Sequence, residues 1–410
     1  MQMRGKLFFL FLCLFELQSC VVDSQVIQPS FLCGERLEKP YGICSHISRL
    51  GENFEFDTRY KELEMIDSLR VDFIRTDFDW HLMRSGNGDF SSHHLDKMME
   101  PVIKKDKMLL GILSSYKPAQ RNSWIDNHLD MIKHFRSKIR YWEVLNEPDL
   151  LYKKRDGFTV NDYLEILKTE YSVIRQADST ATIVFSGIAD SEGKFVNSAF
   201  AQKAHLYCDI MNIHRYTVYD EPEVLCDYYN QLGNMLKKYN VEKSIWLTET
   251  GYATKGERSV DEYVQAQRLP RIFLISFAFG VEKVFWYKSR ASEIVETDRE
   301  NHFGIWHKDY TPKPAFMAYR TLTEMCPNNS TRPVIEKKGD LYVATWKRPD
   351  NIEMTAVWCL EKKHGVKIKK QGVSVKCYDI YGKMILENSK FLNITSSLTY
   401  IEGNNKTIEL

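Results

Sequence analysis

Short apolar runs alternate with amphipathic stretches over most of the chain. Apolar runs of four to eight residues predict buried strands, and longer stretches with one apolar face predict helices. The eight predicted strands are residues 40–44, 71–77, 107–113, 139–146, 181–187, 209–214, 244–250 and 281–287. The predicted helices between them include residues 60–69, 128–135, 160–177, 222–239 and 260–279. Eight consecutive strand–helix units predict an α/β fold of the (β/α)8 TIM-barrel type.

A doubly wound sheet is the alternative arrangement for alternating strands and helices. It would need a glycine-rich turn after the first strand, and the residues that follow 40–44 contain none.

The pattern changes after Pro333. The runs LYVATW, MTAVWCL, VSVKCYDI and SLTYIEG are separated by turn-like stretches, and no helical pattern follows. Alternation with a period of two is typical of antiparallel strands that bury one face. We therefore predict a catalytic barrel over residues 36–328 and a small C-terminal antiparallel β-sandwich domain over residues 329–410. Residues 21–35 could add a strand to the second domain.

The first 20 residues predict an export signal. Two basic residues precede the apolar run Leu7–Phe15, which is too short to span a bilayer. The LQSC sequence at residues 17–20 resembles the lipobox of bacterial lipoproteins. We predict a signal peptide over residues 1–19, Cys20 as the lipid acceptor, and a secreted protein anchored by that lipid in a bacterial envelope, either periplasmic or at the cell surface. An ordinary signal peptide is the alternative.

Composition and cysteine spacing exclude several classes of partner and of structural site. Fifty-six Lys and Arg residues oppose 55 Asp and Glu residues, and a net charge of +1 argues against a nucleic-acid partner. Beyond Cys20 the chain has an odd number of cysteines and no Cys-x-x-Cys pair, which predicts free thiols rather than a disulfide framework or a zinc site. A pair between Cys359 and Cys377 is left open.

Polar residues cluster at the carboxyl ends of the predicted strands, where (β/α)8 barrels carry their reactive groups. Two of them, Glu147 and Glu249, are carboxylates on different strands. If they lie about 5 Å apart, one can attack the anomeric carbon of a sugar while the other protonates the departing oxygen. A third carboxylate, Glu143, lies deeper in its strand, and we expect it to form a buried ion pair.

Two segments, YWEVLNEPDL (141–150) and WLTETGYAT (246–254), resemble the acid/base and nucleophile strands of the clan A glycoside hydrolases, which are retaining (β/α)8 enzymes. Further similar segments are DFIRTDFDW (72–80), NIHRYTV (212–218), VFWYKSR (284–290) and the residues from 301 to 322. The resemblance covers most of residues 40–325. The matching segments resemble those of both family 39 and family 5.

The resemblance implies a role for each matching residue. Glu147 matches the general acid/base and Glu249 the nucleophile. Asn146 matches the residue that binds the sugar 2-hydroxyl, and Arg75 matches the residue that steadies the charge of the nucleophile. The function that it implies is a retaining glycoside hydrolase that cleaves a β-glycosidic bond in a polysaccharide or glycoconjugate by double displacement, with no metal or organic cofactor.

Four more residues are expected to bind the substrate. His214 or Tyr216 matches the group that contacts the nucleophile or the bound sugar, and Trp286 matches the aromatic floor under the sugar. Asp77 stands at the same edge and could bind sugar hydroxyls.

The predicted partner is an oligo- or polysaccharide. Lys288, together with Arg215 and Arg290, places three cations beside the predicted site, which favours an acidic sugar such as a uronate. A glycan-binding barrel lipoprotein without catalytic activity is the alternative. The presence of both Glu147 and Glu249 counts against it.

Overall fold

The computed structural model describes residues 24–48, 56–83, 91–114, 121–154, 157–189, 193–361, 364–368, 375–386, 391–403 and 408–409. The predicted signal peptide and Cys20 lie outside these residues. None of the helices in the described part is both long enough and apolar enough to cross a membrane.

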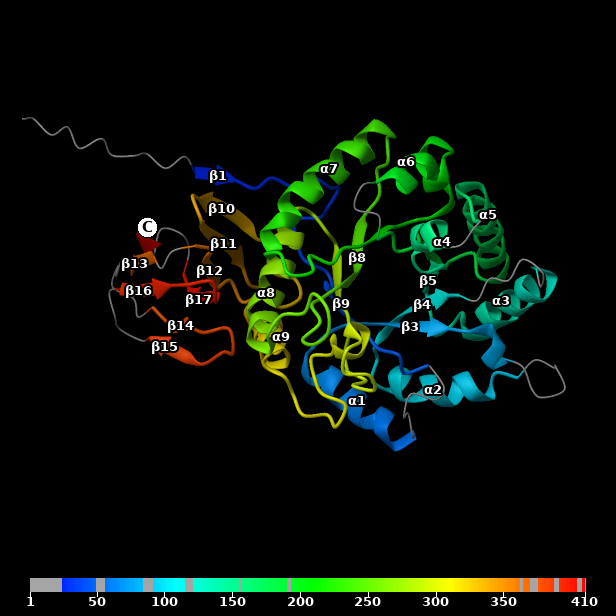
Figure 1. Cartoon of the computed structure of the whole chain (residues 1–410), viewed down its shortest axis with the longest axis horizontal. Coiled ribbons are helices and arrows are strands. Elements are labelled where there is room, and N and C mark those ends of the chain that lie inside the picture. The colour runs from blue at the N-terminus through cyan, green and yellow to red at the C-terminus, as the bar shows by residue number, and fades with distance from the viewer. Residues whose placement is uncertain are drawn as a thin grey trace, which may run out of the picture.

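Eight parallel strands form a nearly closed barrel, which occupies the right of Figure 1. They are β2 (Tyr41–Cys44), β3 (Phe73–Phe78), β4 (Met108–Leu113), β5 (Tyr141–Val144), β6 (Thr182–Val184), β7 (Met211–His214), β8 (Ile245–Thr250) and β9 (Lys283–Trp286). The hydrogen-bonded order β6-β5-β4-β3-β2-β9-β8-β7 is closed by isolated parallel bridges between Val184 and Ile210 and between Ile188 and Ile213. The predicted (β/α)8 barrel is confirmed.

Helices surround the barrel (Figure 1). They are α1 (Phe56–Ser68), α2 (His93–Lys104), α3 (Arg121–Phe135), α4 (Pro148–Lys154), α5 (Val160–Ala177), α6 (Lys194–Ala201), α7 (Leu225–Lys238), α8 (Glu262–Ala278) and α9 (Pro314–Met325). Short 3-10 turns are η1 (Trp80–Met83), η3 (Ala204–Tyr207), η4 (Pro222–Val224) and η5 (Arg299–His302). The start of α5 is set by a capping box, in which Thr159 and Asp162 satisfy each other's backbone N–H groups.

Alternate residues of each barrel strand point to opposite sides, because side chains alternate along a strand. One set packs in the barrel interior: Cys44, Phe73, Leu110, Val184, Ile210, Trp246 and Phe285. The other set, including Ile74, Ile213 and Val284, packs in the larger core with residues of the helices. Residues in phase with the first set therefore point toward the barrel axis, and those at the carboxyl ends of the strands face the mouth.

The C-terminal part forms an antiparallel domain at the left of Figure 1, as predicted. One sheet has the order β1-β10-β11-β12-β17-β14-β15 and the other β16-β13-β18. The strands are β1 (Ser24–Val26), β10 (Val334–Lys338), β11 (Leu341–Lys347), β12 (Glu353–Cys359), β13 (His364–Ile368), β14 (Cys377–Tyr378), β15 (Met384–Leu386), β16 (Phe391–Ile394), β17 (Thr399–Glu402) and β18 (Ile408–Glu409).

The N-terminal strand β1 belongs to the antiparallel domain, because Ser24 pairs with Lys338 of β10 at the edge of the larger sheet. The seven cysteines of the described residues are free thiols, including Cys359 and Cys377.

Buried polar contacts fasten the antiparallel domain to the barrel. Trp358 of β12 donates its indole N–H to Glu223 Oε1 at 2.7 Å. Arg271 of α8 donates from Nε to the same oxygen at 2.9 Å and from Nη2 to Glu221 Oε2 at 2.8 Å. Helix α8 lies between the two domains in Figure 1, which explains why almost all of its residues are buried.

Replacing Arg271 by Met should destabilise the protein, because Glu223 would become a buried charge without its cation. We expect the free energy of unfolding, measured by urea titration, to fall by about 3–5 kcal/mol. Arg320, whose exposed side chain pairs with Glu324 in the next turn of α9, provides the matched control. Arg320→Met should cost at most about 0.5 kcal/mol, and an equal loss in the two variants would contradict the buried-pair assignment.

Candidate active site

Arg75 is the centre of a buried network at the carboxyl end of the barrel. Its guanidinium donates to both oxygens of Glu143, from Nε at 2.7 Å and from Nη2 at 2.8 Å. It also donates to Glu249 Oε1 at 2.5 Å and to Asn146 Oδ1 at 2.8 Å. Burial alone would lower the pKa of Arg75, but the charges of Glu143 and Glu249 raise it well above its ordinary value. The expected ion pair of Glu143 is confirmed, and its partner is this arginine.

Glu249 is buried at the end of β8 with both carboxylate oxygens occupied. Arg75 binds Oε1, and the Tyr216 hydroxyl donates to Oε2 at 2.6 Å. Burial alone would raise the pKa of Glu249, but the charges of His214 and Arg75 and the hydrogen bonds from Tyr216 and Arg75 hold it below its ordinary value. This carboxylate is therefore kept ionised.

Glu147 faces Glu249 across the mouth. One oxygen of each carboxylate lies within 4.8 Å of the other, and the Glu147 side chain is 18% exposed. The backbone that carries it is bent, with left-handed φ angles of 64° at Leu145 and 46° at Glu147. Such angles are unfavourable for residues with a Cβ and are found where a side chain must be held in a particular position.

His214 joins the two carboxylates. Its Nδ1 lies 3.0 Å from Glu147 Oε1 and its Nε2 lies 3.0 Å from Thr248 Oγ1. The Thr248 hydroxyl in turn donates to Asn212 Oδ1 at 2.7 Å. Room for the ring exists because residue 187 is glycine: a Cβ there would lie 1.9 Å from Nε2. Neither Thr248 nor Asn212 was predicted. Asn212 lies two residues before the predicted His214 and in phase with it, whereas Thr248 directly precedes the predicted Glu249, at a point where the register of β8 against its neighbours is irregular.

A second polar group lines the mouth beside this network. His46 Nδ1 lies 3.2 Å from Asp77 Oδ2, and His46 Nε2 lies 3.5 Å from the Tyr287 hydroxyl oxygen. The Tyr287 ring makes edge contacts with Tyr216 and Phe303, with centroids 6.1 and 5.4 Å apart. His46 was not predicted, although its position two residues after the first barrel strand places it at the correct edge.

Trp286 does not reach the mouth. Its side chain is fully buried among residues of the outer core, and its ring centroid lies 6.5 Å from that of Tyr252. Because successive residues of β9 point to opposite sides, Phe285 and Tyr287 point toward the barrel axis. The expectation that Trp286 forms the floor under the sugar is therefore wrong, and Tyr287 is the aromatic residue of this strand that faces the mouth.

Of the three cations expected beside the site, one packs elsewhere. The Arg215 guanidinium lies 4.8 Å from the ring centroid of Tyr228 on α7. Arg290 binds the hydroxyl of Tyr310 and lies 4.8 Å from its ring centroid. Lys288 and Arg290 nevertheless line a small pocket together with His46, and Lys288 Nζ lies 5.8 Å from the ring centroid of the preceding tyrosine. The support for an acidic sugar is reduced to these two cations.

Glu147, His214 and Glu249 bring one donor atom each within 4.8 Å of the others. A cation among them would compete with the Arg75 guanidinium, which is 2.5 Å from Glu249, and with the Tyr216 hydroxyl. Like-charge repulsion at such distances in a buried site disfavours metal binding. The cluster is better suited to moving protons.

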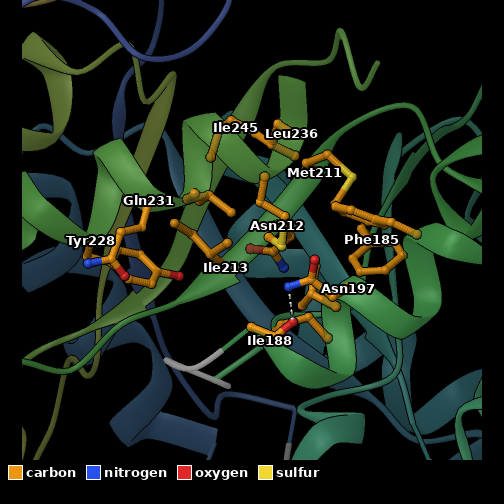
Figure 2. A pocket seen from close by; sticks show the side chains of 15 residues that line it. Phe185, Ile188, Asn197, Met211, Asn212, Ile213, Tyr228, Gln231, Leu236 and Ile245 are labelled. Carbon is orange, nitrogen blue, oxygen red and sulfur yellow. Dashed lines mark hydrogen bonds between the residues drawn. The ribbon is translucent and has the colours of Figure 1, made fainter. Parts of the chain in front are cut away.

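A separate apolar cavity of about 210 Å³ lies between β7 and the helices α6 and α7. Figure 2 shows side chains such as Met211, Ile213, Leu236 and Ile245 around it. Its described lining includes none of the residues predicted for the site, and Met211 and Ile213 belong to the outer set of strand residues. The cavity thus lies outside the barrel mouth, and Asn212, which accepts from Thr248, belongs to both the cavity lining and the site network.

Comparison with known proteins adds information on the fold. No family model and no curated protein matches the sequence. The structure is similar to a family 39 glycoside hydrolase from Bacteroides cellulosilyticus WH2, with a TM-score of 0.72 and 18% identity, over 92% of this chain and 83% of that chain. It is also similar to a family 39 β-xylosidase from Caulobacter crescentus, with a TM-score of 0.67 and 13% identity, over 92% and 98%.

A family 30 subfamily 8 xylanase from Clostridium acetobutylicum is a further structural neighbour, with a TM-score of 0.59 and 12% identity, over 90% of this chain and 97% of that chain. The chain has the fold of the clan A glycoside hydrolases. The resemblance seen in the sequence segments is thereby matched by the fold. The neighbours include members of families 39, 30, 5 and 2, so the fold does not select one family.

Introducing a methyl group at Gly187 should disturb the barrel at its mouth. The new Cβ of Gly187→Ala would overlap the His214 ring, so we expect the free energy of unfolding to fall by about 1–3 kcal/mol. Gly365, where a Cβ would meet nothing within 4 Å, provides the control. Thermal or urea unfolding of the two variants checks this, and equal stability would contradict the close approach at His214.

The charge of His214 should appear in the pH dependence of stability. Burial lowers the pKa of His214, but the charge of Glu249 and the hydrogen bond to Glu147 outweigh it and raise the pKa above the ordinary value of 6.5. The raised pKa increases the free energy of unfolding. This contribution is fully present below about pH 6.5 and is lost as the pH rises through the folded-state pKa. The difference in unfolding free energy between wild type and His214→Asn should therefore shrink from pH 6 to pH 9.

His205 provides the opposite control, since burial and nearby lysines lower its pKa. A lowered histidine pKa gives a contribution that is lost as the pH falls. The difference between wild type and His205→Asn should therefore shrink toward acid pH. A His214 difference with the same trend as the His205 difference would contradict the assignment.

Proposed function

We propose that this protein is a retaining glycoside hydrolase that cleaves a β-glycosidic bond in a polysaccharide or glycoconjugate. The observation that carries the proposal is that one carboxylate oxygen of Glu147 lies within 4.8 Å of one carboxylate oxygen of Glu249 at the barrel mouth. Retaining enzymes need carboxyl groups about 5–5.5 Å apart, whereas inverting enzymes need about 6.5–9.5 Å to admit a water molecule. The separation supports double displacement.

In the first step, Glu249 attacks the anomeric carbon as the bond from that carbon to the glycosidic oxygen breaks. Glu147 gives its proton to the departing oxygen, and a covalent glycosyl ester of Glu249 forms. In the second step, Glu147 takes a proton from water, the oxygen of that water attacks the anomeric carbon, and Glu249 leaves as a carboxylate. The reaction consumes one water molecule and returns both residues to their initial states.

The contacts of Glu249 suit the nucleophile role. Arg75 and Tyr216 favour its ionised form before attack and again when it leaves as a carboxylate. Asn146 uses Oδ1 to accept from Arg75, and its side-chain nitrogen is therefore the donor available to a sugar hydroxyl. His46, Asp77 and Tyr287 provide further polar groups for hydroxyls at the mouth.

A glycan-binding barrel without turnover is the second candidate. It would not require two opposed carboxylates, an ionised nucleophile or a histidine between them. We therefore favour the enzyme.

The substrate is to be found by screening. The structural neighbours include a β-xylosidase, a glucosidase, a xylanase and a β-galacturonidase bound to galacturonate. A panel of aryl β-xylosides, β-glucosides and β-galacturonides therefore covers both neutral and acidic sugars. Lys288 gives a reason to include the acidic sugar.

Single substitutions of the two carboxylates test the mechanism. Glu249→Ala should abolish hydrolysis of every substrate in the panel. Glu147→Ala should lower kcat by about 10²–10⁴-fold on natural linkages, while an activated aryl glycoside should still glycosylate the enzyme, because its leaving group needs little protonation. Added azide should then restore turnover of Glu147→Ala and give a β-glycosyl azide.

Glu296→Ala, at an exposed carboxylate, is the control and should retain full activity. Full activity of Glu147→Ala or Glu249→Ala would refute the assignment. An α-configured azide product would refute double displacement on a β-glycoside.

We further propose that the enzyme is exported and anchored through a lipid on Cys20, and the LQSC sequence at residues 17–20 supports this. Expressed in a bacterium, the wild type should partition into the detergent phase of Triton X-114, whereas Cys20→Ser should remain in the aqueous phase. Aqueous partitioning of the wild type would favour an ordinary signal peptide.

A further inference from the structure

We propose that Thr248 and Asn212 are positioning residues that keep a proton on Nε2 of His214 and thereby leave Nδ1 to share a proton with Glu147. The catalytic consequence rests on the proposed glycosidase function. The position of the proton itself is measurable without turnover.

The Thr248 hydroxyl determines whether His214 Nε2 donates or accepts a hydrogen bond. A hydroxyl has one proton, and Thr248 donates it to Asn212 Oδ1 at 2.7 Å. The same oxygen lies 3.0 Å from His214 Nε2. Because its proton is directed to Asn212, the Thr248 oxygen can only accept at that contact, and Nε2 is the donor.

Arg75 does not offer Nε2 an alternative donor. Its Nη2 lies 3.4 Å from Nε2, but its two protons are directed to Glu143 Oε1 and to Asn146 Oδ1, both at 2.8 Å. A bare Nε2 would therefore be a buried acceptor with no proton donated to it, which is unfavourable. The Glu143 carboxylate, with Oε1 3.8 Å from Nε2, adds a negative charge that favours an N–H group there.

The proton on Nε2 determines the behaviour of Nδ1. A neutral imidazole protonated at Nε2 has a bare lone pair on Nδ1. Glu147 Oε1 lies 3.0 Å from it, and two bare acceptors at this distance repel each other. One proton therefore lies between them, and we identify it as the proton that Glu147 gives to the departing glycosidic oxygen.

Groups from four strands surround the ring, and three of these strands carry the charged residues. Arg75 approaches from β3, Glu143 and Glu147 from β5 and the turn after it, and Glu249 from β8 with Oε2 3.6 Å from Nδ1. The fourth strand, β6, is followed by Gly187, which contributes only backbone beside the ring. Burial lowers the pKa of His214, but the charge of Glu249 and the hydrogen bond to Glu147 raise it overall, which is consistent with a second proton shared between Nδ1 and Glu147.

The opposite tautomer would weaken the acid. With the proton on Nδ1, the ring would donate to ionised Glu147 and stabilise it, because a hydrogen bond to a charged form favours that form. The general acid would then lose its proton at lower pH. Two substitutions should cause this change: Thr248→Val removes the hydroxyl with little change of shape, and Asn212→Leu removes the acceptor and frees the Thr248 proton to turn toward Nε2.

Nitrogen NMR of protein labelled with 15N-histidine tests the position of the proton directly. The His214 signals are assigned by their loss in His214→Asn. At neutral pH we expect a protonated Nε2 in the wild type and in the matched control Thr248→Ser, and an unprotonated Nε2 in Thr248→Val and Asn212→Leu. A bare Nε2 in the wild type would overturn the proposal, as would an unchanged protonated Nε2 in both Thr248→Val and Asn212→Leu.

The pH profile of kcat/KM tests the catalytic consequence. The basic limb should move down by about one pH unit in Thr248→Val and stay in place in Thr248→Ser. A purely structural role of Thr248 would lower kcat/KM equally at every pH, and an unmoved limb would overturn the catalytic consequence. If the wild type hydrolyses no glycoside, the proposed function fails, while the NMR result still decides where the proton lies.

Discussion

The site depends on one buried cation. Arg75 lies under the barrel mouth with its charge balanced by Glu143 and Glu249, and a buried guanidinium is tolerated only when such partners satisfy it. Glu143 takes two of its N–H groups and fixes the plane of the guanidinium. The remaining N–H groups of the guanidinium then point at Glu249 and Asn146. The ion pair deeper in the barrel therefore helps to position these two residues at the mouth.

His214 adds a second level of order to the same network. Its ring lies between two carboxylates on one side and Thr248 on the other, and Gly187 leaves it the space. Arg75 fixes where negative charge resides, whereas His214 and its partners fix where the mobile proton resides. The two carboxylates can therefore carry different protonation states although they face each other across the mouth.

Most of the barrel could be predicted from the sequence, because fully buried strands give short apolar runs of an unmistakable kind. All eight predicted strands overlap the observed ones, and α5 has the predicted bounds. Helices α2, α4, α6 and α9 were not among the named predictions; α4 and α6 are short, and α2 contains Pro101. The paired contacts of Arg75 with Glu143 were only partly predictable, because they join residues that are far apart in the chain.

Side-chain direction was the weak point for the site. Trp286 was expected at the mouth, but the alternation along β9 directs Tyr287 there and places Trp286 in the outer core. Arg215 was expected beside the site, yet its guanidinium packs on Tyr228 of α7. Closeness in sequence to a strand end shows that a residue is near the mouth, and it does not show which way its side chain points.

The short strand β1 limits how far the barrel could lie from a lipid on Cys20. It begins at Ser24, four residues after Cys20, and is held in register at the edge of the antiparallel sheet by pairing with Lys338. Four residues extend at most about 14 Å. A lipid on Cys20 would thus hold this sheet close to the bilayer, because the linker would be too short to let the protein move away from it. Since Trp358 and Arg271 fasten the sheet to the barrel through Glu223, a glycan would have to come to the membrane surface to be cleaved.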